Sequence, residues 1–119
     1  MIDLETLGTA QNTVVLSLGA VKFDPFNNLD PTHALYIDIL WCQGPLFDYA
    51  ILEDFYRNMQ QPCPWHYWQI RDSRTLFALM PRDPRKDIQQ ELHNALADAY
   101  FQAQCVQKTY KHFNITTGQ

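Results

Sequence analysis

The chain has 119 residues, of which 46% are hydrophobic, and a formal net charge of −4 at pH 7. This size and apolar content suit a single globular domain over residues 1–119 and exclude general disorder. The apolar runs are shorter than the ~20 residues that cross a bilayer, and no basic segment precedes an apolar one as in a signal peptide. We therefore expect a cytoplasmic protein without membrane association.

Strand patterns dominate the first part of the chain. Apolar and acidic residues alternate over residues 1–5, which predicts a strand whose two faces differ. After a polar loop, the β-rich residues 14–23 predict a second strand. A turn with two prolines follows, and residues 34–41 predict a third strand.

The second part of the chain changes to helical patterns. Apolar residues recur at helical spacing over residues 48–59, and prolines end that segment. Residues 65–79 predict a short strand that runs into a helical turn, residues 81–86 a charged loop, and residues 87–113 the longest helix. Strands followed by helices predict an α+β or a mixed α/β domain.

The first candidate site is the pair Asp3 and Glu5. Residues two apart on a strand point to the same face, and two adjacent carboxylates repel each other unless a cation lies between them. Oxygen ligands of this kind suit Mg²⁺ or Mn²⁺. The alternative is the exposed polar face of an edge strand. The acidic balance of the chain also fits a cation site better than a basic nucleic-acid patch.

Three further residues extend this hypothesis. On one helix, His93 and Asp98 would diverge by roughly 140°, so they share a site only if His93 lies at the helix entrance or in the preceding loop. The alternative is a capping or surface histidine and a solvated aspartate. Asp48 precedes a predicted helix, where it either caps the helix or points into a cleft.

Taken together, these motifs resemble the DnaQ-like DEDDh 3′→5′ exonucleases of the ribonuclease H-like fold. Within that group, the chain is most similar to phage and bacterial proteins related to exonuclease VIII and to the 3′→5′ exoribonuclease-like domain. The matching runs are MIDLETLGT, NTVVLSLGAVKFDP, GPLFDYAIL, PCPWHYWQIRDSRTL and HNALADAYFQAQ.

The resemblance implies a two-metal hydrolase that acts on the 3′ end of single-stranded DNA or RNA and releases nucleoside 5′-monophosphates. His93 would be the general base that takes a proton from the attacking water. The implied ligands of two Mg²⁺ or Mn²⁺ ions are Asp3, Glu5, Asp48 and Asp98. The implied substrate contacts are Thr6, Leu7, Phe47 and Arg74.

Some side chains leave two interpretations open. Arg74 contacts a phosphate or pairs with Asp72 to hold the fold, and we expect the pairing. The aromatic residues 65–68 stack on bases or pack in the core, and we expect core packing. The basic residues near 82–86 meet the nucleic-acid backbone or form a solvated loop.

The chain departs from the family pattern in two places. Only Met1 and Ile2 precede Asp3, so the first strand is clipped. Between the third strand and the strand that leads to Asp48, the family has a long helical crossover that is absent here. Because parallel neighbours need a connection of a dozen or more residues, we expect a sheet truncated or rearranged around residues 37–44. The sheet loses a strand or borrows one from another copy, which predicts a homo-oligomer or strand-exchanged dimer.

These departures favour a second hypothesis, in which an internally deleted, catalytically impaired family member serves as a binding module or is a prophage remnant. A third hypothesis is a ribonuclease H-like nuclease that cuts internally. The spacing of His93 and Asp98 favours the exonuclease.

Overall fold

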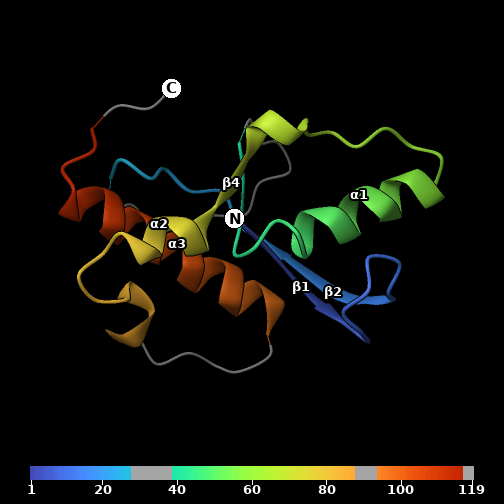
Figure 1. Cartoon of the computed structure of the whole chain (residues 1–119), viewed down its shortest axis with the longest axis horizontal. Helices are drawn as coiled ribbons and strands as arrows, with labels where there is room; N and C mark the ends of the chain where they lie inside the picture. Colours follow the sequence, from blue (N-terminus) through green and yellow to red (C-terminus); the bar gives the residue numbers. More distant parts are fainter. Residues whose placement is uncertain (28–38, 88–93, 117–119) are drawn as a thin grey trace.

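A computed structural model describes residues 1–27, 39–87 and 94–116 (Figure 1). Its helices, strands and 3₁₀ turns follow the chain as β1 (Ile2–Thr6), β2 (Val15–Ala20), β3 (Leu40–Cys42), α1 (Asp48–Asn58), η1 (Tyr67–Gln69), β4 (Ile70–Asp72), α2 (Ser73–Ala78), η2 (Pro84–Asp87) and α3 (Ala95–His112). Within these ranges, no helix combines the length and apolar composition needed to span a bilayer.

The strands form one four-stranded mixed sheet in the order β2-β1-β3-β4. β1 pairs with β2 in the antiparallel direction, and β3 runs parallel to both β1 and β4. The carboxyl ends of β1, β3 and β4 therefore meet at one edge of the sheet. Helices flank the sheet, which confirms the predicted α/β class and its ribonuclease H-like arrangement.

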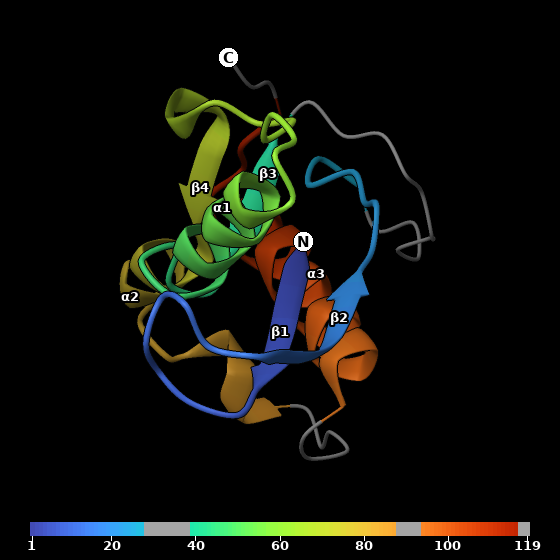
Figure 2. The same ribbon diagram turned by 90° about the vertical axis from the view of Figure 1, so that its right-hand side faces the viewer.

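The two faces of the sheet pack against different helices, as Figure 2 shows. Because successive strand residues alternate between faces, Ile2 points toward α1 while Asp3 and Glu5 point toward α3. The α1 side buries Ile2, Leu40, Cys42 and Leu52. The α3 side buries Met1, Val21, Trp41, Phe77, Ala99, Phe101, Ala103, Cys105 and Val106. Both acids of β1 thus lie where α3 covers the sheet.

Gly19 fixes how closely α3 approaches the sheet. A Cβ atom at this position would lie 2.1 Å from the carbonyl oxygen of Ala95, the first residue of α3. Since Gly19 is the partner of Asp3 in the β1–β2 register, this contact sets the start of α3 directly beside the acidic face of β1.

Side-chain caps define where two helices begin. The Oδ1 atom of Asn94 accepts a hydrogen bond from the Ala97 amide at 3.0 Å, so α3 begins at Ala95 and the predicted start at residue 87 is wrong. Asp87 instead ends η2, which occupies part of the predicted loop 81–86. Asp72 caps α2 by accepting from the amides of Arg74 and Thr75.

The described part of the segment around residues 37–44 contains a short strand. β3 takes up residues 40–42 and lies beside β1 on the side opposite to β2. Most of the predicted third strand, 34–41, lies outside the described residues. Within the described ranges β2 pairs only with β1, and the side chains of Leu16 and Leu18 are 60% and 48% exposed. The predicted oligomer stays a prediction.

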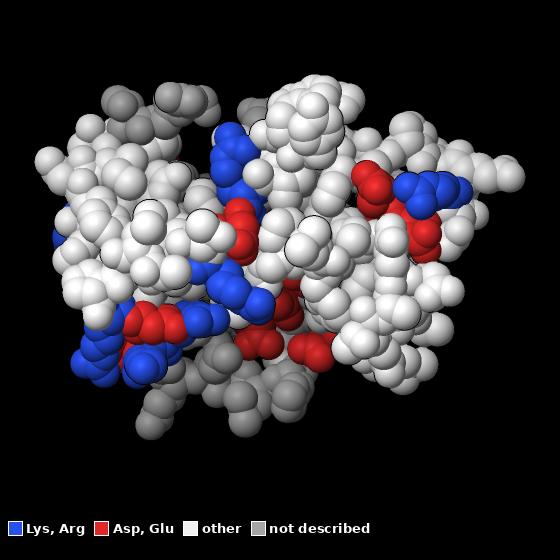
Figure 3. Space-filling model, in the orientation of Figure 1, with Lys and Arg blue, Asp and Glu red and all other residues white. Residues whose placement is uncertain are grey.

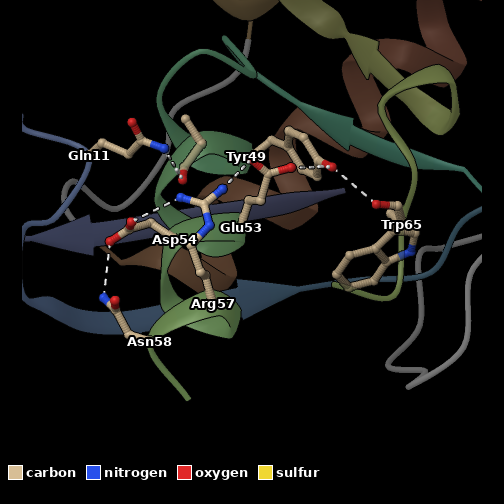
Figure 4. Close-up of polar contacts among 8 residues, drawn as sticks. Gln11, Tyr49, Glu53, Asp54, Arg57, Asn58 and Trp65 are labelled. Atoms are coloured by element: carbon tan, nitrogen blue, oxygen red, sulfur yellow. Dashed lines mark hydrogen bonds and ion pairs between the residues drawn. The ribbon is translucent and has the colours of Figure 1, made fainter. Parts of the chain in front are cut away.

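Polar contacts tie α1 to its surroundings (Figure 4). The Tyr49 hydroxyl donates to the carbonyl oxygen of Trp65 at 3.0 Å, and the Gln11 amide donates to the carbonyl oxygen of Ala50 at 3.4 Å. One contact attaches the loop between β1 and β2 to α1, and the other attaches the segment just before η1 to α1. The position of this segment relative to α1 is therefore fixed at Trp65.

Candidate metal centre

Three carboxylates meet on the α3-covered face of the sheet, at the start of α3. Asp3 and Glu5 come from β1 and Asp98 comes from the first turn of α3, and each offers an oxygen within 4.8 Å of the others. They converge because the strand places Asp3 and Glu5 on one face and the contact at Gly19 sets the start of α3 above them. Figure 3 shows acidic side chains gathered between the end of β1 and the start of α3.

The electrostatics of this group favour a bound cation. Burial, together with repulsion from Asp98 and Glu5, raises the pKa of Asp3 to about 6. The amide of Gln102 opposes this shift by donating to Asp3 Oδ1 at 3.2 Å. Because the group is half-buried and its charges repel, a divalent cation would relieve both costs.

The cleft around these acids also presents oxygen ligands without partners. It has a volume of about 460 Å³. Among the described residues, Gln43 Oε1 and Gln102 Oε1 are buried and accept no hydrogen bond. Carboxylate and amide oxygens are the ligands that Mg²⁺ and Mn²⁺ prefer. The donor set therefore fits a divalent cation. The residues that line the cleft are Asp3, Leu4, Glu5, Gln43, Arg85, Asp98, Phe101 and Gln102.

Asp48 lies close to this group but bonds to the backbone. Its side chain is 3% exposed, and its Oδ1 atom accepts from the Leu4 amide at 3.2 Å. Leu4 lies beyond the last β1–β3 pair, Ile2 with Cys42, so its amide uses the carboxylate instead. Burial raises the pKa of Asp48 to about 7, and repulsion from Asp3 adds to the shift. Asp48 is the first residue of α1 and not its cap, so the capping interpretation is wrong.

A family model of the 3′-5′ exoribonuclease Rv2179c-like domain matches residues 27–110. The chain belongs to this family. Membership supports 3′-5′ exonuclease activity in general terms. The matched segment includes Asp48 and Asp98 but begins after Asp3 and Glu5. Asp3 and Glu5 are connected to the family segment by their position next to Asp98 in the structure. No curated protein and no solved structure matches the chain.

The remaining predicted site residues of this exoribonuclease-like chain, apart from Arg74, lie away from the cleft lining or outside the described ranges. His93 lies outside the described residues. The Thr6 hydroxyl donates to the Gly8 carbonyl oxygen at 2.7 Å, and Leu7 is exposed. Phe47 is half-buried directly before α1. None of these three described residues lines the cleft.

Arg74 reaches the edge of the cleft. Its guanidinium donates to the carbonyl oxygen of Gln43, a cleft residue, at 3.4 Å. Arg74 meets Asp72 only through its backbone amide, at 3.0 Å, so the expected side-chain pairing is wrong. The Arg74 guanidinium therefore lies beside the C-terminal end of β3, next to the cleft.

Two polar cleft residues of this family member, Gln43 and Gln102, escaped the sequence interpretation, which had considered Arg85. Gln102 follows Asp98 by four positions, which places both on one face of α3, and this spacing was a usable signal. Gln43 follows β3 directly. Arg85 belongs to the basic segment, where its guanidinium pairs with Asp83 and lies 5.7 Å from the centre of the Phe77 ring.

Proposed function

We propose that this chain hydrolyses phosphodiester bonds at the 3′ end of single-stranded nucleic acid, releases nucleoside 5′-monophosphates and depends on Mg²⁺ or Mn²⁺. The observation that carries the proposal is the convergence of Asp3, Glu5 and Asp98 within 4.8 Å. Membership of the exoribonuclease-like family supports the 3′→5′ direction and makes RNA the first substrate to test.

Each acidic side chain has a proposed role. Asp3, Glu5 and Asp98 would hold the cations, and two such ions supply charge stabilisation for the attacking and leaving oxygens of an in-line displacement. Asp48 keeps β1 in place through the Leu4 amide. A carboxylate has two oxygens, so Asp48 can keep this bond with one and present the other to the site.

The uncharged and basic side chains have separate proposed roles. We propose His93 as the group that accepts a proton from the attacking water, because an imidazole accepts protons near neutral pH. Gln43 and Gln102 offer their buried Oε1 atoms to the cation or to its ligands. Arg74, at the edge of the cleft, suits the phosphate next to the scissile bond.

The test follows a 5′-labelled single-stranded RNA and the matching DNA with Mn²⁺, with Mg²⁺ and with a chelator. The wild-type chain should shorten the RNA stepwise from its 3′ end, with mononucleotides as the product. The Asp3→Asn variant should lose about 100-fold or more of this rate. The control Asp54→Asn removes a carboxylate that pairs with Arg57 in α1 and does not line the cleft, and it should keep the wild-type rate.

Three outcomes count against the proposal. Internal cuts would point to a ribonuclease H-like endonuclease. Equal rates for wild type and Asp3→Asn would exclude the acidic cleft as the site. Mn²⁺ binding without turnover would favour the impaired family member that serves as a binding module.

A further inference from the structure

A second surface feature lies at the end of β4 remote from the acidic cleft, at η1. Tyr67 is 78% exposed and Trp68 is 58% exposed, whereas Trp41 in the core is 8% exposed. The expected core packing is therefore wrong for these two aromatic side chains. Large exposed rings are costly in water, and such rings are enriched where proteins bind partners.

The exposed rings are held in a fixed arrangement. The Trp68 indole stacks on the His66 imidazole with centroids 4.2 Å apart and planes 9° apart, and Tyr67 meets Trp68 edge-on at 5.1 Å. The Gln69 Oε1 atom accepts from the His66 amide at 2.8 Å, which closes the turn. The residue before His66, Trp65, accepts a hydrogen bond from the Tyr49 hydroxyl through its carbonyl oxygen (Figure 4). Rings fixed before binding lose little conformational entropy when a flat ligand stacks on them.

Positive charge lies between these rings and the cleft. The Arg71 guanidinium donates to the carbonyl oxygen of Trp68 at 2.8 Å, and Arg74 lies at the cleft edge. Among the described residues, neither arginine forms a salt bridge. The basic residues that do are Arg57, Arg82, Arg85 and Lys108. In a chain of net charge −4, two arginines without a salt bridge, one on β4 and one at the start of α2, suit an anionic ligand.

The chain runs from the rings of η1 through Arg71 on β4 to Arg74 at the edge of the cleft. β4 has three residues, about 10 Å of extended chain, and it separates η1 from Arg74 at the start of α2. Figure 3 shows basic side chains on the face where β4 and α2 lie, next to the acidic cluster. A strand whose 3′ end occupies the cleft can therefore follow β4 and reach the rings within a few nucleotides.

We propose that η1 and β4 bind the single-stranded nucleic acid on the 5′ side of the scissile bond. Tyr67 and Trp68 stack on bases, while Arg71 and Arg74 contact phosphates. Stacking is tolerant of sequence because every base has an aromatic face. The inference rests on the proposed function, since the 3′ end is taken to lie in the cleft. It adds a length requirement, because short substrates do not reach the rings.

The test compares a dinucleotide with an oligonucleotide of about 12 nucleotides, a length within the range of single-strand binders. The variant is Tyr67→Ala/Trp68→Ala, and the matched control is Leu79→Ala, which removes another exposed apolar side chain. The double variant should bind the longer oligonucleotide about 5- to 150-fold more weakly for each stacked base, by fluorescence anisotropy with a chelator present. Its hydrolysis of the dinucleotide should equal that of wild type.

Two conservative variants separate stacking and charge from a general structural effect. Trp68→Phe keeps a ring and should restore most of the affinity. Arg71→Gln should reduce the dependence of affinity on salt, with a slope smaller by about 0.7 for one lost phosphate contact on a single strand. Circular dichroism should show the wild-type spectrum for all variants.

The outcomes distinguish this inference from the proposed function. Equal affinity of wild type and double variant for the longer oligonucleotide would overturn the inference, as would an equal loss on the dinucleotide. A wild-type chain that cleaves nothing, combined with weaker binding by the double variant, would reject the exonuclease and support the surface. If the rings instead bind a second copy, light scattering would show a dimer that the double variant lacks, with unchanged oligonucleotide affinity.

Discussion

Replacement of Gly19 by alanine tests how the fold positions the acidic cleft. The new Cβ atom would lie 2.1 Å from the Ala95 oxygen, 2.2 Å from the Ala95 carbonyl carbon and 2.4 Å from the Leu96 nitrogen. All three are backbone atoms, so no side chain can rotate away. Ordinary contacts begin near 3.4 Å, so the start of α3 must move by roughly 1.3 Å, an overpacking that costs about 1–3 kcal/mol.

The same movement disturbs the metal centre. Asp98 lies in the first turn of α3, three residues after Ala95, so it moves with the helix start. Metal–ligand distances tolerate deviations of only about 0.2 Å. Gly19→Ala should therefore lower the melting temperature by about 5–15 °C for a domain of this size, and it should also abolish the stabilisation by Mn²⁺.

The assay is thermal unfolding followed by circular dichroism, with and without Mn²⁺. The control is Gly8→Ala, where the new Cβ would lie 3.2 Å from the Thr13 Oγ1 atom, a side-chain atom that can move aside. This control should keep the wild-type melting temperature and its response to Mn²⁺. A Gly19→Ala variant with wild-type values for both would refute the packing of α3 on β2.

Three other predictions concern stability and assembly. Burial raises the pKa of Asp48 to about 7, and that of Asp3 to about 6, above their ordinary value of 3.8. At these two acids the folded state binds more protons than the unfolded chain, so they lower the free energy of unfolding of the metal-free protein as pH rises from about 4 through 7, and Asp48→Asn should remove its share of this fall in urea titrations. Asp72→Ala removes the cap of α2 and the acceptor of the Gly44 amide at 3.1 Å, and should cost about 1–2 kcal/mol by urea unfolding. The exposed apolar face of the edge strand β2 predicts a dimer in light scattering, which Leu16→Lys should dissociate.

Each of these predictions has a contradicting result. A pH profile that Asp48→Asn leaves unchanged between pH 4 and 7 would reject the buried acids as its source. Asp54→Ala is the control for Asp72→Ala, because the Asp54 carboxylate bonds to the side chains of Arg57 and Asn58 and caps no helix, and equal losses from both would reject the cap. A monomer at micromolar concentration would reject the dimer.

Local patterns predicted the elements whose signal lies within a few residues. The alternation over residues 1–5 gave the strand that carries Asp3 and Glu5, and the helical spacing over 48–59 matches α1 closely. The start of α3 was not predictable in this way, because both Asp87 and Asn94 are good capping residues.

The arrangement of the site depends on tertiary contacts that the sequence does not display. Asp98 meets the β1 acids because Gly19 admits α3 close to the sheet. Asp48 bonds to the Leu4 amide because β3 ends at Cys42, and the chain pattern does not fix where that pairing stops. Residue types thus predicted the acidic chemistry, while strand length and helix contact decide which acids converge.

Isothermal titration of the chain with Mn²⁺ at pH 7.5 tests the acidic cleft most directly. Wild type and the control Asp54→Asn should bind Mn²⁺ with the same affinity, and Asp98→Asn should bind it at least about 10-fold more weakly. Equal Mn²⁺ affinity for wild type and Asp98→Asn, or no Mn²⁺ binding by the wild-type chain, would contradict the assignment of Asp3, Glu5 and Asp98 as a metal centre.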